Sequence, residues 1–217
     1  MEDRDWLNPH ENFLTRYSRH DAYSKNAVLF DVTAGYSWRV NGFFALKAYA
    51  DFSYMRFSWS GENGYAQYAS SGSWNSDLPV INLTGKVIEY TQNWFIFSPG
   101  FSIMWNPGSI ITLEGYFSYS PLIYCASIDK HFLANKTFYD YLYYGHFFNG
   151  GGQVIYTLRP NIDLAFSFSY KRIIGSRGDN VTVTEYGGVS VSDDYNGIAG
   201  GGYSAIDIGI FLKLNLF

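Results

Sequence analysis

Residues 162–171 read IDLAFSFSYK, a run in which every second residue is apolar. The apolar residues are Ile162, Leu164, Phe166, Phe168 and Tyr170, and they alternate with Asp163, Ala165, Ser167, Ser169 and Lys171. Because successive side chains of a β-strand point to opposite faces, the run predicts a strand with one apolar and one polar face. Residues 28–39 repeat the pattern. A soluble sandwich would bury the apolar set, whereas a membrane barrel would turn it towards lipid, so alternation alone leaves both open.

The composition favours the barrel. Aromatic residues make up 20% of 217 residues, with 20 Tyr and 18 Phe, yet the mean hydropathy is −0.12. A barrel places aromatics on its lipid face and in its interfacial girdles, while its polar lumen lowers the mean hydropathy. The sequence contains no run of 18 apolar residues, so it does not predict a transmembrane helix. A net charge of −4 without a basic run argues against nucleic-acid binding, and the single cysteine, Cys125, excludes an internal disulfide and a cysteine-type metal cluster.

Connection lengths give the architecture. The pattern predicts seven strands, at about 27–40, 43–58, 87–105, 109–124, 140–157, 161–173 and 202–217. Tight turns fall near 41–42, 106–108 and 159–161, and long links at about 59–86, 125–139 and 174–201. Strict alternation of short and long links is typical of an outer-membrane barrel with short periplasmic turns and long outer loops. We expect the lumen to hold Asp31, Lys47, Asp51, Glu114, Asp163 and Lys171.

The topology predicts which segments meet. If the last strand ends on the periplasmic side, counting back places residues 1–26 and 125–139 at the same outer rim. Bacterial single-chain barrels almost always have an even number of strands, so seven implies that an odd number is missing before Met1. The chain also opens without a signal peptide. We therefore expect residues 1–217 to form a single barrel domain that lacks its first strands.

Two acidic clusters fall on these outer segments. Asp3 and Asp5 are two residues apart and project from one face of an extended chain. In Asp129-Lys130-His131 the carboxylate can orient the imidazole and stabilise its protonated form. Together they suit hydrolysis by an activated water, although solvated loop acids would give the same spacing. Common serine, zinc and nucleotide motifs are absent, and the other histidines, His10, His20 and His146, fit structural roles.

These residues resemble the motifs of the omptins, ten-stranded outer-membrane proteases. The matching elements, in order, are Asp3-Arg4-Asp5-Trp6, Asn8-Pro9, Ser18-Arg19-His20, Arg56-Phe57-Ser58, Tyr90-Thr91-Gln92 and Asp129-Lys130-His131-Phe132. The resemblance implies that three strands precede those present here. It also implies that His131 activates the attacking water, that Asp129 holds its ring, and that Asp3 and Asp5 face them across a groove. Ser18 and His20 would have a supporting role near the site, and no metal would be required.

Two departures from the family pattern bear on specificity and activation. Omptins place an acid two residues before the catalytic Asp, in a pocket for a basic substrate side chain, and that position is Ser127 here. Omptins also require lipopolysaccharide, held by basic residues on the outer wall. Arg56 matches one of these residues, but Asn93 stands at a second position, and Tyr54 replaces an acid. The expected lipopolysaccharide contact is therefore weaker, with lipopolysaccharide as a possible activator and no other cofactor.

The sequence thus predicts an all-β, antiparallel transmembrane barrel acting as an outer-membrane endopeptidase. We expect it to be a monomer in outer-membrane lipid, with its site facing the cell exterior and cutting surface peptides or proteins. The alternative is a catalytically inactive barrel that acts as an adhesin or loop-binding surface protein. A small porin is a third reading, which a lumen filled with charged side chains disfavours.

Overall fold

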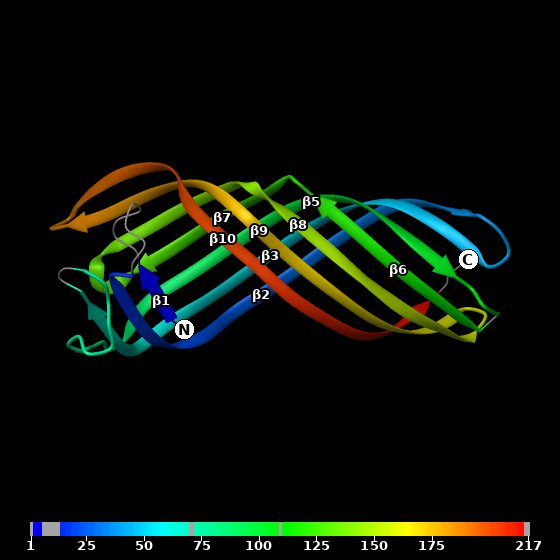
Figure 1. Cartoon of the computed structure of the whole chain (residues 1–217), viewed down its shortest axis with the longest axis horizontal. Helices are drawn as coiled ribbons and strands as arrows, with labels where there is room; N and C mark the ends of the chain where they lie inside the picture. Colours follow the sequence, from blue (N-terminus) through cyan, green and yellow to red (C-terminus); the bar gives the residue numbers. More distant parts are fainter. Residues whose placement is uncertain (1, 6–13, 70–71, 109, 215–217) are drawn as a thin grey trace.

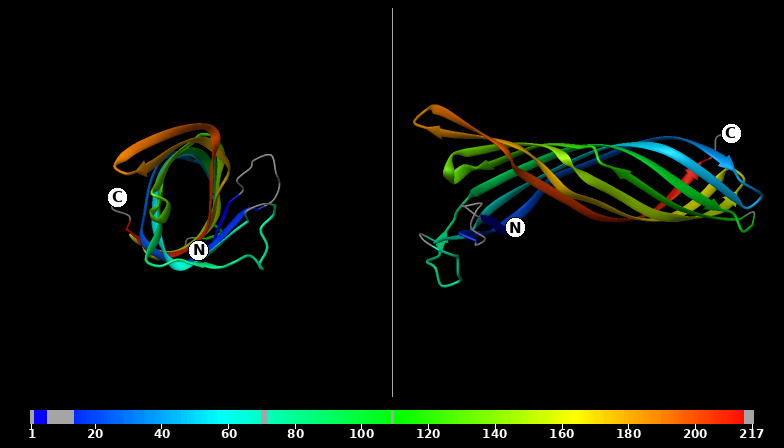
Figure 2. Two further views of the ribbon diagram at one scale, coloured as in Figure 1. Left: turned by 90° about the vertical axis from the view of Figure 1, so that its left-hand side faces the viewer. Right: turned by 45° about the horizontal axis from the view of Figure 1, so that its top comes forward.

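A computed structural model of the chain describes residues 2–5 by their backbone and residues 14–69, 72–108 and 110–214 in full. Nearly all of these residues are in one antiparallel sheet that curls into a long barrel with tilted strands (Figures 1 and 2). The strands are β1 (Glu2–Asp5), β2 (Arg16–Arg39), β3 (Phe44–Tyr68), β4 (Ile81–Asn82), β5 (Lys86–Trp105), β6 (Ile111–Ser120), β7 (Ile123–His131), β8 (Lys136–Arg159), β9 (Ile162–Tyr186) and β10 (Val189–Leu214). The short 3-10 helix η1 (Phe132–Ala134) follows β7. Among the described residues, no helix is long and apolar enough to cross a membrane.

Among the described residues, the barrel wall is made by seven passes of the chain. β6 and β7 form one pass, because both pair with β5 on one side and with β8 on the other. The pass is interrupted at Pro121 and Leu122. Pro121 has no backbone N–H to donate, and the N–H of Leu122 donates to Ser120 Oγ at 3.0 Å instead of to a neighbouring strand. The predicted strand 109–124 is therefore two strands, and the second continues to His131.

The strands extend much further than predicted at one end. We call this end the rim; its connections are residues 69–80, 132–135 and 187–188, and the opposite turn end has the tight connections 40–43, 106–110 and 160–161. The prediction of long loops at 125–139 and 174–201 was wrong, because both segments are mostly paired strand. The link at 59–86 is also strand up to Tyr68. Beyond the membrane both faces of a strand meet water, so Ser, Gly and Asn replace the apolar alternation and the segment looks like a loop.

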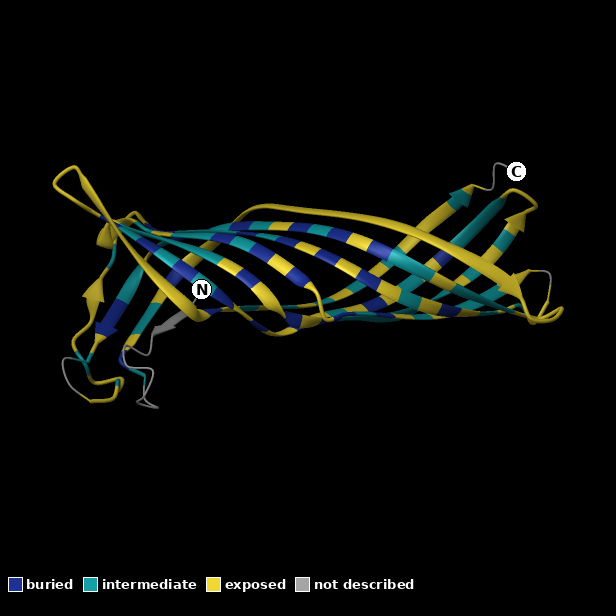
Figure 3. Ribbon diagram, turned by 90° about the horizontal axis from the view of Figure 1, so that it is seen from above, coloured by how far each residue is buried: buried dark blue, intermediate teal, exposed yellow. Residues whose placement is uncertain are grey.

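In the part of the barrel nearer the turn end, which we call the lower part, the apolar residues of each alternating run face outward. Figure 3 shows the alternation as regular bands of exposed and buried residues. On β10, Ile206, Ile208 and Ile210 are 65%, 80% and 68% exposed. Aromatic pairs in contact lie towards each border of this apolar band. Phe44 and Trp105 stack at 6.3 Å near the turn end, and Tyr54 packs on Phe95 at 5.1 Å further up. Such girdles mark the two interfaces of a transmembrane barrel.

The lumen has two parts. The lower part is lined by five of the six polar residues predicted to face inward, Asp31, Lys47, Asp51, Glu114 and Lys171, around a cavity of about 370 Å³. An apolar layer lies above it, and we call it the collar: Met55, Trp94, Ile96, Ile123, Cys125, Leu142, Phe147, Ile173 and Ala199, each 6% exposed or less. The collar separates the polar lower lumen from the rim, where the candidate site lies.

Two side-chain contacts link the two ends of the wall, which are β2 with its neighbour β3 and β10 with its neighbour β9. Among the described residues no backbone ladder connects β2 with β10. Instead, Lys171 Nζ of β9 lies 3.3 Å from Asp31 Oδ2 of β2, and Tyr203 of β10 stacks on Phe57 of β3 at 5.2 Å. The prediction that further strands precede Met1 stays a prediction.

Candidate active site

The inner wall near the rim is a lattice of side chains set by strand register. β5, β7 and β8 lie side by side, so residues of equal height form tiers across them. The top tier is Ile88, His131 and Lys136, the second is Tyr90, Asp129 and Phe138, the third is Gln92, Ser127 and Asp140, and the fourth is Trp94, Cys125 and Leu142. The fourth tier belongs to the collar. The predicted Asp-x-His pair therefore lies two tiers above an apolar floor.

Asp129 and His131 contact each other directly. The Nε2 of His131 lies 3.0 Å from Oδ2 of Asp129, and both side chains are 26% exposed. The imidazole also packs edge-on against Phe138, at 5.1 Å between ring centroids. Asp129 Oδ1 is buried and has no hydrogen-bond partner among the described residues. With Nε2–H donated to Asp129, the ring lone pair lies on Nδ1, which can accept a proton.

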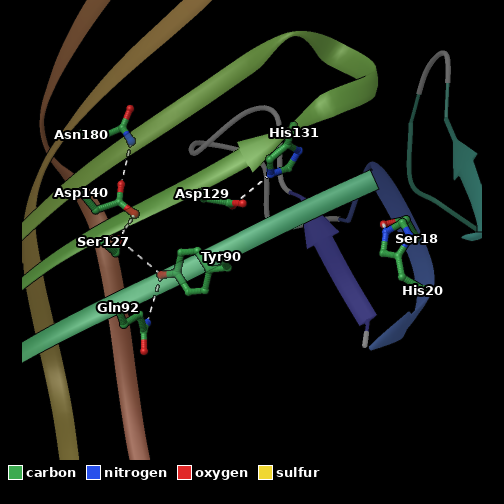
Figure 4. Close-up of polar contacts among 9 residues, drawn as sticks. All are labelled: Ser18, His20, Tyr90, Gln92, Ser127, Asp129, His131, Asp140 and Asn180. Atoms are coloured by element: carbon green, nitrogen blue, oxygen red, sulfur yellow. Dashed lines mark hydrogen bonds and ion pairs between the residues drawn. The ribbon is translucent and has the colours of Figure 1, made fainter. Parts of the chain in front are cut away.

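Ser18 and His20 form a second pair on β2. Oγ of Ser18 lies 2.8 Å from Nε2 of His20, and the imidazole is only 4% exposed. On its other side, Nδ1 of His20 lies 3.1 Å from the backbone carbonyl oxygen of Asn63. The two residues are thus joined in one hydrogen-bonded unit, as Figure 4 shows.

One cavity is lined by both members of the Ser18–His20 pair and by His131 of the other pair. It has a volume of about 120 Å³, and its lining includes Ser18, His20 and His131, together with Val87 and Ile88 of the β5 region. The prediction that the N-terminal and 125–139 segments meet at one rim agrees with this geometry. The described residues contain no group of three or more His, Cys, Asp or Glu side chains that could hold a metal ion.

The backbone of β1 places the other predicted acids beside this unit. β1 pairs with the start of β2, so Asp3 stands opposite Ser18 and Asp5 opposite Arg16. Their side chains lie outside the described residues, as do Trp6, Asn8, Pro9 and His10. The backbone register therefore locates Asp3 next to the cavity without giving the position of its carboxylate.

A hydrogen-bonded network underlies the Asp-His pair and was not predicted from the sequence. Ser127 Oγ donates to Asp140 Oδ2 at 2.8 Å, and Asn180 Nδ2 donates to Asp140 Oδ1 at 2.7 Å. Gln92 Nε2 donates to the Tyr90 hydroxyl at 3.0 Å, and that hydroxyl lies 3.5 Å from Ser127 Oγ (Figure 4). Burial raises the pKa of the Tyr90 phenol above its ordinary value, so it remains a donor at neutral pH. The sequence does not reveal this network because it does not give the strand register. Ser127 pairs with Asp140 only because of the length of the turn between β7 and β8.

Comparison with known proteins decides the family. The family model described as the Omptin family matches residues 1–214. The chain belongs to the omptin family. It is 25% identical over 216 residues to a protein named plasminogen activator from Yersinia pestis, an alignment that includes 94% of this chain and 65% of that protein. The solved structure of the outer membrane protease OmpT from Escherichia coli superposes with a TM-score of 0.82 at 17% identity, over 98% of this chain and 72% of that one. This omptin thus spans about two thirds of the curated relative's length, and the predicted barrel fold is confirmed.

The remaining predicted residue of this omptin, Arg56, lies on the outer wall. It is exposed on β3, directly across from Asn93 of β5. Tyr54, two residues towards the turn end, donates its hydroxyl to Asn93 Oδ1 at 3.1 Å. Arg56 therefore lies on the same face as the upper aromatic girdle and is remote from the rim cavity. Its neighbours Tyr54 and Asn93 add no further positive charge.

Proposed function

We propose that this omptin is an outer-membrane endopeptidase that hydrolyses peptide bonds with a water molecule activated by His131. The observation that carries the proposal is the Asp129–His131 pair, held at 3.0 Å on the inner wall of the rim. In the proposed reaction Asp129 orients the ring and stabilises the imidazolium that forms when Nδ1 takes a proton from water. The activated water then attacks the scissile carbonyl, without a metal ion or a covalent intermediate.

Asp3 and Asp5 are proposed to face His131 and to position the water. Support comes from the backbone register, which sets Asp3 opposite Ser18, a residue of the cavity that His131 also lines. The site opens at the end of the barrel opposite the tight turns, which in an outer-membrane barrel is the extracellular end. The substrates are accordingly peptides or proteins at the cell surface, and the barrel acts as a monomer.

The third tier supports a preference for basic side chains. The sequence places Ser127 where other omptins carry an acid, but Ser127 donates to the Asp140 carboxylate at 2.8 Å. A negative charge is therefore present in the same tier, supplied by the neighbouring strand. Asp140 also lines a cavity of about 340 Å³, which is large enough for a side chain, together with Asn180, Tyr195 and the positively charged Lys136. We therefore take peptides that contain Arg or Lys as the first substrates to test.

Lipopolysaccharide is proposed as an activator held at Arg56. A guanidinium group is suited to phosphate because of its planar set of donors, and Arg56 is exposed beside the upper girdle, where lipid phosphates lie. With Asn93 opposite it, the contact has one positive charge fewer than the family pattern. Activation should therefore need more lipopolysaccharide than in a relative with both basic residues.

The test compares peptide cleavage by the full-length protein in detergent, with and without lipopolysaccharide, for the wild type and three variants. We expect His131→Ala and Asp129→Asn to lower kcat by about 100-fold or more, the usual contribution of general-base catalysis. His146→Ala is the matched control, because His146 stacks on Tyr119 of β6, away from the rim cavity, and should retain full activity. Turnover by His131→Ala equal to that of the wild type would contradict the role of His131, and absence of turnover by the wild type would leave a non-enzymatic surface barrel.

A further inference from the structure

The second histidine of the cavity, His20, is held by a local irregularity of the sheet. β2 and β3 lose register between Arg19 and Asp21, so His20 sits in a bulge. Across from it Asn63 and Gly64 adopt left-handed conformations, with φ of 53° and 98°. The loop segment locks this turn, since Asn63 N–H donates to Gly85 O at 2.8 Å and Gly85 N–H donates to Asn63 Oδ1 at 2.9 Å. Bulges of this kind commonly re-aim a side chain next to an active site.

The irregularity fixes which nitrogen of His20 faces Ser18. Because a carbonyl oxygen can only accept, Nδ1 of His20 must carry the proton in its 3.1 Å bond to Asn63 O. Nε2, 2.8 Å from Ser18 Oγ, is then the nitrogen that exchanges a proton with the hydroxyl. A side chain with an exchangeable proton, a base within hydrogen-bond reach and a third group that orients the base are the parts of a proton-transfer unit.

The two histidines play different parts if the proposed hydrolysis is correct. His131 collects the proton of the attacking water. The amine that leaves when the C–N bond breaks must gain a proton, because an amide nitrogen is not expelled as an anion in water. Ser18 lines the same cavity as His131 but comes from β2 rather than β7. It therefore approaches a bound peptide from a different strand than the attacking water does.

We infer that Ser18 is a further catalytic residue, which donates the proton to the leaving amine and receives one from His20. The inference rests on the proposed function. When His20 is protonated, Nε2–H donates to Ser18 Oγ and turns the hydroxyl proton towards the cavity. As the C–N bond breaks, the nitrogen takes that proton and Ser18 takes the proton of His20. His131 has then gained one proton and His20 has lost one, and exchange with solvent restores both.

The test uses two substrates that share one acyl group, an amide and a phenyl ester. The ester's phenolate can leave without a proton, whereas the amine cannot. In the full-length protein with lipopolysaccharide, Ser18→Ala should lower the amide-to-ester ratio of kcat about 100-fold, the size of a general-acid contribution. His20→Gln should give the same selective loss. Ser18→Thr, which keeps the hydroxyl and suits a strand, should preserve the ratio.

Each outcome decides the question. Equal losses on the amide and the ester would overturn the inference, because a purely structural role affects both substrates alike. An acyl adduct on Ser18, detected as a mass increase of the intact wild-type protein, would also overturn it, since Ser18 would then be a nucleophile. Loss of the proposed function shows separately, because His131→Ala would then leave both substrates unaffected. Gel mobility of unheated samples confirms that each variant is folded.

Discussion

Leu142 offers a direct test of whether the collar is a packed core inside the barrel. The side chain is 1% exposed, belongs to the collar cluster and lies in the fourth tier beside Cys125. Gly201 of β10 closes over it, since a Cβ at that glycine would lie 3.1 Å from Leu142 Cδ1. We expect Leu142→Ala to destabilise the barrel, because the flanking ladders prevent the wall from collapsing into the space that is left.

The magnitude follows from the buried atoms. Three carbons are lost from an apolar site, at about 0.8 kcal/mol each, or about 2.4 kcal/mol. A residual cavity of up to roughly 70 Å³ would add up to about 1.7 kcal/mol, at about 24 cal/mol per Å³. The free energy of unfolding should therefore fall by about 2.4 to 4 kcal/mol, the span between full and no collapse.

The assay is urea unfolding in detergent micelles, followed by tryptophan fluorescence and extrapolated to zero denaturant. The matched control is Leu122→Ala, because Leu122 is 70% exposed at the break between β6 and β7 and leaves no internal cavity. We expect the control to lose less than about 1 kcal/mol, as is usual for exposed positions. A loss at Leu142 no larger than at Leu122 would refute the view that the collar is close-packed.

Three further predictions follow from the same structure. A close-packed collar should block ion flow, so the wild type should show no single-channel conductance in planar bilayers. Trp94→Ser should conduct, because it opens the collar, and conductance by the wild type would contradict a sealed collar. Hydrogen bonds from Lys25 and Lys86 lower the pKa of Glu89, outside the membrane near the rim, from 4.5 to about 2, so their stabilising effect is present above pH 4.5 and lost as pH falls towards 2. Glu89→Gln should make the unfolding midpoint less dependent on pH over this range. A midpoint that changes with pH as steeply as in the wild type would count against the ion pairs. Gly64→Ala should lower stability and activity together, because its Cβ would overlap the carbonyl of Arg19 and displace the turn that holds His20; activity equal to wild type would show that the turn is dispensable.

The sequence predicted the lower barrel well because the physics there is simple. Within the membrane one face of each strand meets lipid and the other meets a polar lumen, so apolar and polar residues must alternate. Ile206, Ile208 and Ile210 follow this rule and are exposed outward. Towards the rim the rule no longer applies, and strands rich in Ser, Asn and Gly look like loops in the sequence. Their pairing is visible only in the register, as between Tyr139 and Val181.

The candidate site shows the same division between local and non-local information. The contact of Asp129 with His131 follows from a spacing of two on one strand, which the sequence displays directly. The orientation of His20 depends instead on a bulge in β2 and on a left-handed Asn63, 43 residues away. Asp140 meets Ser127 only because the β7–β8 turn has the length it has. No local pattern reports either arrangement.

These differences explain why the candidate site lies where the prediction expected loops. A loop would hold His131 and Ser18 with little precision, whereas β7 is paired on both edges and β2 is paired on both edges at Ser18. Proton transfer requires donor and acceptor within hydrogen-bond reach, so a fixed lattice suits it better than a mobile segment. The collar adds a second condition, because it separates the cavity from the charged lower lumen. The long strands beyond the membrane thus act as the scaffold of the site, and the apolar collar forms its floor.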